Sequence, residues 1–140
     1  MKKDAVRLKD IIYGGRSYPT SGRVEKWYCT DTKEYVNLQE LIDKGVCTNK
    51  DKDTLLPALR YIQFFEVDIE KSERHFLNSL NDRRYLKLFD SVPAEDFDIK
   101  FNIFLEQAQL EHRWREYENA VLRKAAQDWC IQNRVPFLDS

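Results

Sequence analysis

The last third of the chain has the most regular pattern of apolar and polar positions. From Leu110 to Trp129, apolar residues recur at steps of four or three, with charged residues between them. This spacing is typical of one face of an amphipathic α-helix. It predicts a long helix over residues 110–133, whose core stripe consists of Leu110, Trp114, Tyr117, Val121, Ala125 and Trp129.

Similar spacings predict three shorter helices upstream of it. One begins near Asp68, one covers residues 85–89, and one begins near Asp96. The second must end before Pro93, because the residue preceding a proline is disfavoured in the α region.

The first half of the chain mixes strand and turn patterns. Aromatic and β-branched residues in 24–30 and 34–36 flank a turn-like segment, which predicts a hairpin. Residues 59–65 are a candidate third strand. Because an isolated hairpin is only marginally stable, the hairpin must gain that strand or pack against helices.

Short helices and loops complete the pattern. Residues 5–13 predict a short helix ended by Gly14 and Gly15, and Asn37 is a candidate N-cap for a helix over 38–44. Residues 16–22 and 48–53 are predicted loops, because they hold turn formers or lack apolar residues.

These elements predict a helix-rich α+β fold. An N-terminal β-hairpin or small antiparallel sheet would pack against four or five C-terminal helices. With 140 residues, 42% of them hydrophobic and 34% charged, the composition is that of an ordinary globular protein. We expect residues 1–140 to form one α+β domain, since no repeat or long polar linker divides them.

The composition also suggests a compartment. No apolar run approaches the roughly 20 residues of a membrane span, and no signal-peptide core follows the charged start, so we expect no membrane partner. The three cysteines are odd in number and far apart, which favours reduced thiols over disulfides or a zinc site. We expect a cytoplasmic location.

A search for catalytic patterns leaves little. The only histidines, His75 and His112, fall in different predicted helices, and neither belongs to a metal-binding motif. The Gly14–Gly15 segment lacks the spacing of a phosphate-binding loop. Cys29 has no neighbouring base in the sequence, and Cys130 lies in the periodic helix. We therefore predict no catalytic residue, metal or cofactor. An enzyme without a recognisable motif stays open but is less favoured.

Charge is unevenly distributed within a nearly neutral chain. Residues 1–60 hold 12 basic and 9 acidic side chains, whereas residues 61–140 hold 11 and 15. Negative charge at helix starts is favoured by the helix dipole, which explains part of this clustering. The hypothesis we favour is a protein-interaction module that recognises a basic partner surface. It could be an immunity protein or an inhibitor of a nucleic-acid-acting enzyme. Its predicted contact residues are Glu66, Asp68, Glu70, Glu73, Asp96 and Asp98.

The alternative is a nucleic-acid or nucleotide binder. Cations and aromatic side chains together hold single strands, and the N-terminal half carries both. In a hairpin one of two adjacent aromatic side chains faces inward, so only one of them would remain available for stacking. The residues of this alternative are Arg16, Arg23, Lys26, Trp27 and Tyr28.

Several segments carry a resemblance to a known family. These are the run 75–84, Phe101–Leu105, Trp114–Tyr117 and Ala125–Asn133, together with the hairpin and Leu8–Ile12 near the start. In these segments the chain resembles the bacterial uncharacterised protein family one-five-eight. Because that family has no established activity, the resemblance implies a cytosolic α+β fold and transfers no catalytic or binding residue.

The sequence interpretation depends on the role of the aromatic C-terminal helix. If Trp114 and Trp129 are core residues, specificity must reside in exposed charged groups. If they line an open hollow beside a histidine or a thiol, catalysis becomes the better hypothesis. The sequence does not decide whether the chain is a monomer or a homodimer.

Overall fold

The computed structural model describes residues 5–20 and 22–139. They form two compact units. Unit 1 contains the described residues of 1–15, 24–66 and 123–140, and unit 2 those of 16–23 and 67–122. Each unit is therefore assembled from separated stretches of chain. The prediction of one domain stays a prediction.

Unit 1 contains the predicted hairpin and its third strand. Strands β3 (Lys26–Cys29), β4 (Glu34–Asn37) and β5 (Tyr61–Gln63) form an antiparallel sheet in the order β4-β3-β5. In its register Trp27 stands between Val36 and Gln63. The central strand is thus paired on both sides, as an otherwise marginal hairpin requires.

Two helices contribute to a small core with the sheet. They are α2 (Leu38–Asp43) and α3 (Lys52–Ala58), and the cluster they form contains Trp27, Leu38, Leu41, Cys47 and Leu56. The loop predicted over 48–53 ends earlier than predicted, because α3 begins at Lys52. Thr48 and Asp51 exchange backbone-to-side-chain hydrogen bonds of 2.6 and 3.2 Å, which fixes the turn that leads into α3.

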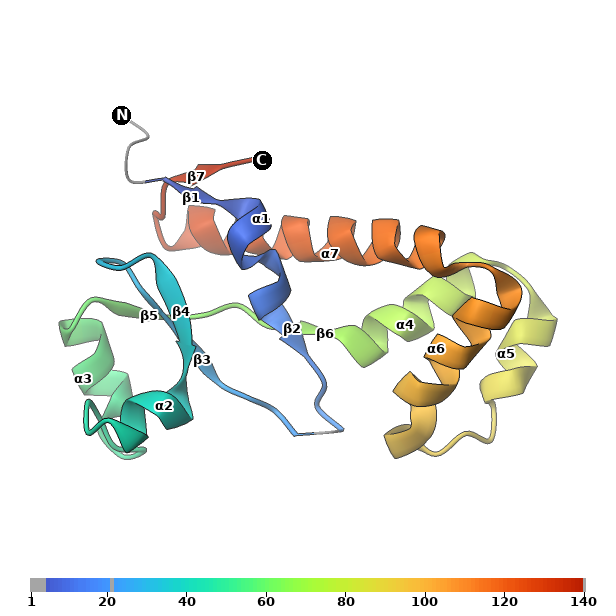
Figure 1. The fold of residues 1–140 in the computed structure, drawn as a ribbon, viewed down its shortest axis with the longest axis horizontal. Coiled ribbons are helices and arrows are strands. Elements are labelled where there is room, and N and C mark those ends of the chain that lie inside the picture. The colour runs from blue at the N-terminus through green and yellow to red at the C-terminus, as the bar shows by residue number, and fades with distance from the viewer. Residues whose placement is uncertain (1–4, 21, 140) are drawn as a thin grey trace. The chain divides into compact units, whose positions relative to one another are not determined.

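The N-terminal segment is only partly the predicted helix. It consists of β1 (Val6–Arg7), α1 (Leu8–Ile11) and the 3₁₀ turn η2 (Ile12–Gly15). Strand β1 pairs in parallel with β7 (Phe137–Leu138), so segments near the two ends of the chain lie side by side (Figure 1). This pairing is non-local, and local periodicity cannot reveal it.

The second face of the sheet is covered by aromatic rings. Trp129 packs edge-on against Tyr28 and Phe64, with both centroid distances at 5.1 Å. Its indole Nε1 donates a hydrogen bond of 2.9 Å to the carbonyl oxygen of Gln63. Because that polar group is satisfied, the large ring can be buried without an unpaired donor.

Unit 2 is mostly helical. It contains α4 (Ile69–Ser79), α5 (Arg83–Phe89), η3 (Ala94–Asp96), α6 (Phe97–Ala108) and the part of α7 (Glu111–Gln132) that ends at Leu122. A short parallel pair joins β2 (Arg16–Ser17) to β6 (Val67–Asp68). The core is aromatic: Trp114 lies 5.0 Å from Phe101 and 5.4 Å from Phe76, between ring centroids.

The buried face of α7 differs from the predicted stripe. Trp114 and Trp129 are buried as predicted, at 7% and 6% exposed, but Tyr117, Val121 and Ala125 are only half-buried. Between the two tryptophans, the buried positions stand one residue later than the predicted ones, because the series continues from Trp114 by a step of four and not of three. These positions are Glu118, Leu122 and Ala126, and Cys130 continues the series.

The predicted helix-rich α+β fold is confirmed (Figure 1). The helices predicted to begin near Asp68 and Asp96 begin at Ile69 and Phe97, and those predicted over 85–89 and 110–133 are present as α5 and α7, with ends that differ by one or two residues. In the described part of the chain, no helix has the length and apolarity needed to cross a bilayer. Both C-terminal tryptophans are core residues and do not line an open hollow.

Candidate functional site

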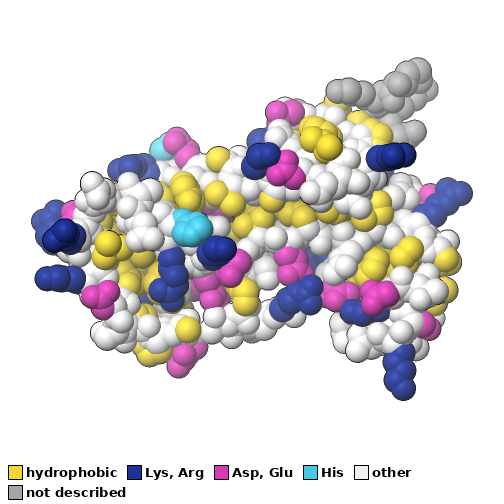
Figure 2. All heavy atoms as spheres, turned by 180° about the vertical axis from the view of Figure 1, so that it is seen from behind, with side chains coloured by type: hydrophobic (Ala, Val, Ile, Leu, Met, Phe, Trp, Pro, Cys, Tyr) yellow, Lys and Arg dark blue, Asp and Glu magenta, His cyan; other side chains and the backbone are white. Residues whose placement is uncertain are grey.

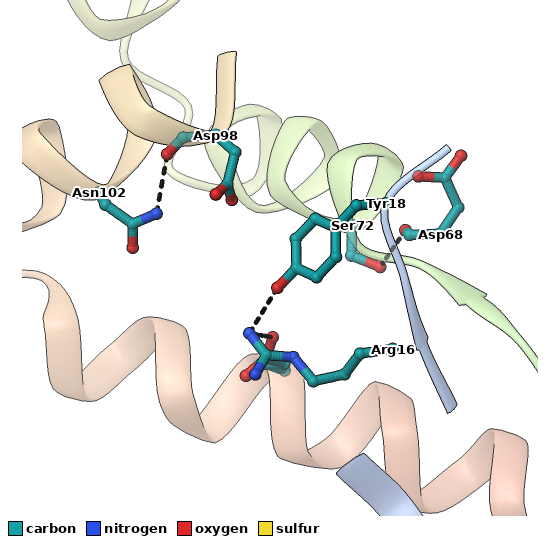
Figure 3. A network of polar contacts seen from close by, with 7 residues as sticks. Arg16, Tyr18, Asp68, Ser72, Asp98 and Asn102 are labelled. Atoms are coloured by element: carbon teal, nitrogen blue, oxygen red, sulfur yellow. Dashed lines mark hydrogen bonds and ion pairs between the residues drawn. The ribbon is translucent and has the colours of Figure 1, made fainter. Parts of the chain in front are cut away.

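A cluster of ionisable side chains lies within unit 2 (Figure 3). The pairing of β2 with β6 sets Ser17 opposite Asp68 and so brings the 16–20 segment beside the start of α4. We call Arg16, Tyr18, Glu73, Asp98 and Glu118 the carboxylate cluster. Its members come from β2 and the loop after it, α4, α6 and α7, so only the tertiary fold assembles it.

Arg16 connects two members of the cluster. Its Nη2 donates a hydrogen bond of 2.6 Å to the Tyr18 hydroxyl and lies 3.2 Å from Oε2 of Glu118. The Arg16 side chain is 39% exposed and that of Glu118 only 9%. Burial raises the pKa of Glu118, and the charge of Arg16 opposes this shift. The guanidinium therefore compensates an otherwise costly buried carboxylate.

Glu73 is the most deeply buried ionisable group of the cluster, at 1% exposed. The pKa of Glu73 is raised to about 10, and burial is the largest cause. A hydrogen bond with Asp98 and the negative charges of Asp98, Glu70 and Glu118 also contribute to this shift. At neutral pH, Glu73 is therefore a protonated acid that donates to the Asp98 carboxylate. Among the described residues, Oε1 of Glu73 has no hydrogen-bond partner.

Tyr18 keeps its proton for the same reason. Burial raises the pKa of Tyr18 to about 12; the Arg16 charge opposes the shift, and the charges of Asp98, Glu118 and Glu73 add to it. At neutral pH, Tyr18 and Glu73 are thus hydrogen-bond donors and not bases. The cleft that unit 2 presents is lined by other residues. This arrangement favours a structural role for the cluster over acid–base catalysis.

The structure places the predicted acidic contact residues differently. Asp68 is exposed and caps α4, accepting a 3.0 Å hydrogen bond from the backbone N–H of Lys71. Glu70 is half-buried and accepts from the backbone N–H and hydroxyl of Thr20. Asp96 is exposed at the N-cap of α6 without a side-chain capping bond.

The remaining three differ in accessibility. Asp98 is half-buried, and Asn102 donates a 2.8 Å hydrogen bond to its backbone carbonyl oxygen (Figure 3). Glu66 is exposed and belongs to unit 1. Placing Glu73 on the contact surface was wrong: its side chain faces the interior of the helices of unit 2, where no partner can reach it.

The stacking platform of the nucleic-acid alternative is absent at the predicted residues. Trp27 and Tyr28 are 3% and 1% exposed, so the expectation that one of them faces outward was wrong. The physical reason is that both faces of the sheet are covered, one by the α2–α3 core and the other by Trp129.

The cations of that alternative also have structural partners. Lys26 Nζ donates a 2.8 Å hydrogen bond to the carbonyl oxygen of Gly14, and burial lowers the pKa of this amine. Arg16 pairs with Glu118, and Arg23, which is exposed, also has an interaction partner. Each of these cations therefore interacts within the chain, and the aromatic residues Trp27 and Tyr28 are inaccessible.

Sequence reasoning missed two members of the cluster. Tyr18 lies in a predicted loop without any signal of burial. Glu118 had a signal, because it stands four residues after Trp114 and four before Leu122, so a buried face with steps of four would have included it. The predicted step of three after Trp114 selected Tyr117 and Val121 instead.

The thiols and the histidines of the described part of the chain differ in exposure. Cys29, Cys47 and Cys130 are free and buried, and burial raises the pKa of Cys130 to about 11. His75 and His112 are both exposed. The described residues contain no group of three or more metal-ligating side chains that could hold an ion.

Comparison with protein-family models, with curated proteins and with solved structures found no match for this chain. The resemblance to family one-five-eight therefore stays a prediction from the sequence motifs.

Proposed function

We propose that this protein is a non-enzymatic interaction module whose unit 2 recognises a basic surface on a protein partner. The contact residues of the proposal are the predicted acids that remain accessible in unit 2: Asp68, Glu70, Asp96 and Asp98. Glu66 is exposed but belongs to unit 1, and Glu73 is buried.

The observation that supports the proposal is the convergence of two acidic segments that are separate in the sequence. The negative charges of Glu70 on α4 and Asp98 on α6 both act on Glu73 and raise its pKa. Because charge interactions fade over about 8–10 Å at physiological salt, side chains that influence one group contribute to one local field. Glu73 itself is protonated at neutral pH and adds no charge to it.

The field is local and does not cover the whole unit. Figure 2 shows Lys and Arg side chains interspersed with Asp and Glu on the face it displays, including the part formed by α4–α6. A local acidic site steers an incoming basic partner and raises its association rate, while contributing less to the final affinity. This behaviour suits an inhibitor or immunity protein whose target has a basic cleft.

The proposal includes the predicted cytoplasmic location. The three cysteines are all free thiols, as proteins of reducing compartments have. A target that acts on nucleic acid is a further part of the proposal, since such enzymes present cationic clefts to their substrates.

Affinity capture with charge variants tests the proposal. The wild-type chain and the E70Q/D98N variant, each tagged, are incubated with a lysate of the native host, and bound proteins are quantified by mass spectrometry. The matched control is E106Q/E111Q, which removes two exposed carboxylates elsewhere in unit 2. Circular dichroism checks that all three are folded.

We expect a basic protein that is retained by the wild type and the control and is lost at least tenfold on E70Q/D98N. Association rates measured with that protein should fall with added salt for the wild type and less steeply for the variant. Equal capture by all three chains, or capture of nucleic acid alone, would overturn the proposal.

A further inference from the structure

Unit 2 has a groove of about 420 Å³ that the acidic surface does not use. Its lining consists of Arg74, Leu77 and Asn78 of α4, Leu86 and Phe89 of α5, Asp90 directly after α5, and Phe97 at the start of α6. The volume lies within the range of about 300–1,000 Å³ that small-ligand sites occupy. The groove combines apolar walls with three polar groups.

Arg74 is held in place by an aromatic ring. Its guanidinium carbon lies 4.0 Å from the centroid of the Phe97 ring, and Phe97 is 1% exposed. Among the described residues, no hydrogen bond or ion pair satisfies the Arg74 guanidinium. A stacked guanidinium keeps the N–H groups of its edge available for two parallel hydrogen bonds to a carboxylate.

The apolar lining of the groove indicates that a ligand whose carboxylate binds Arg74 also carries an apolar group. An ion pair of an exposed arginine contributes too little by itself for a specific site. Leu86 lines the same groove and is half-buried, whereas Leu77, Phe89 and Phe97 beneath it are 2%, 9% and 1% exposed. A ligand that carries an apolar group would bury it mainly against Leu86 while its anion faces Arg74.

Asp90 restricts the charge of the ligand. It is exposed and lines the same groove as Arg74. Its negative charge disfavours a dianion such as a phosphate monoester, because like charges in one groove repel each other. A singly charged carboxylate with a neutral apolar body therefore suits the groove better than a phosphorylated ligand or nucleic acid.

We propose that this groove is a binding site for a carboxylate on an apolar or aromatic group, which Arg74 binds through its guanidinium. Asn78 stands one helical turn after Arg74 on α4 and offers an amide to the same ligand. The carboxylate has two sources, a free small acid or the C-terminal residue of a partner peptide. This inference is independent of the proposed protein-contact surface, because the groove uses none of the four carboxylates of that surface, Asp68, Glu70, Asp96 and Asp98.

Nuclear magnetic resonance of the ¹⁵N-labelled full chain tests this site. The probes are N-acetyl-L-phenylalanine, its neutral carboxamide, phenyl phosphate, and an acetylated tetrapeptide of three glycines ending in phenylalanine with a free carboxylate. The side-chain amide of Asn78 reports on the groove directly. The variants are R74Q and, as the matched control, R115Q, which removes an exposed arginine from α7 within unit 2.

We expect N-acetyl-L-phenylalanine to shift the Asn78 amide resonances, and to bind at least fivefold more tightly than the carboxamide or phenyl phosphate. R74Q should lose at least fivefold in affinity, and R115Q should bind as the wild type does. Tighter binding of the tetrapeptide than of the free acid identifies a peptide C-terminus as the source, and the reverse identifies a small acid. Equal binding of acid and carboxamide, tighter binding of phenyl phosphate, or an unchanged affinity in R74Q would overturn the proposal.

Discussion

Replacement of Glu73 by glutamine should stabilise this protein at neutral pH, although it removes a buried side chain of the cluster. Glutamine has nearly the same shape as glutamic acid and keeps an N–H that can donate to Asp98. The change therefore leaves packing and the hydrogen bond nearly as they are in the protonated acid. What it removes is the ionisation of Glu73 in the unfolded chain.

The magnitude follows from proton linkage. The pKa of Glu73 is about 10 in the folded chain, against an ordinary value of 4.5. Below pH 4.5, both states bind the proton and Glu73 has no cost. Between 4.5 and about 10, only the folded state keeps it, so stability falls by about 1.4 kcal/mol for each pH unit. At pH 7, this amounts to a cost of up to about 3 kcal/mol, which E73Q abolishes.

Urea unfolding at pH 5, 6, 7 and 8 measures the difference in free energy of unfolding between E73Q and the wild type. The unfolding is followed by circular dichroism and by the fluorescence of Trp114 and the two other tryptophans. We expect E73Q and wild type to have similar free energies of unfolding at pH 5, with a gap that widens in favour of the variant as the pH rises. The control E106Q, at an exposed glutamate of α6, should run parallel to the wild type. If E73Q is less stable than wild type at pH 7, or if their difference does not change with pH, the buried protonated acid is refuted.

Three further substitutions test the structure. D68A should lower the free energy of unfolding by about 1 kcal/mol, because it removes the side-chain cap of α4. D96A should lower it little, because Asp96 stands at an N-cap without a side-chain bond. Equal losses of the two variants in chemical denaturation would contradict this prediction. Arg16→Met should destabilise the chain more than the double variant R16M/E118Q, because only the single change leaves a buried charge unpaired. A double-mutant cycle in urea measures the coupling energy between the two residues. Strictly additive effects would contradict the proposed pairing. G15A places a Cβ against the ring of Phe65 and should cost about 1–3 kcal/mol as overpacking. A lower melting temperature would show this cost, and an unchanged one would contradict it.

Much of the secondary structure could be derived from the sequence, because it depends on neighbours a few residues apart. The hairpin, its third strand and the C-terminal helices follow from apolar periodicity and turn residues. The small parallel pairs β1–β7 and β2–β6 could not be derived in this way. They join segments about 130 and 50 positions apart, and a two-residue strand has no periodicity of its own.

For the candidate site too, the sequence predicted the local features and the tertiary structure decided the rest. Counting charges identified the acids at the starts of α4 and α6, and their exposure at Asp68 and Asp96 follows from their capping positions. Whether a carboxylate faces water or the core was decided only by packing. Glu70 and Glu73 stand less than one turn apart on the same helix, yet Glu73 turns inward to meet Asp98 and Glu70 binds Thr20.

What the sequence by itself determined is therefore local: the type and approximate extent of the main helices and strands, and a helix-rich α+β class. The tertiary structure alone decided which ionisable groups are buried, which protons they keep, and which arginine covers a ring beside an open groove. The physical reason is that hydrogen-bonded helices and strands are set by interactions a few residues apart. Desolvation and charge pairing, by contrast, depend on atoms that distant segments bring within a few ångströms.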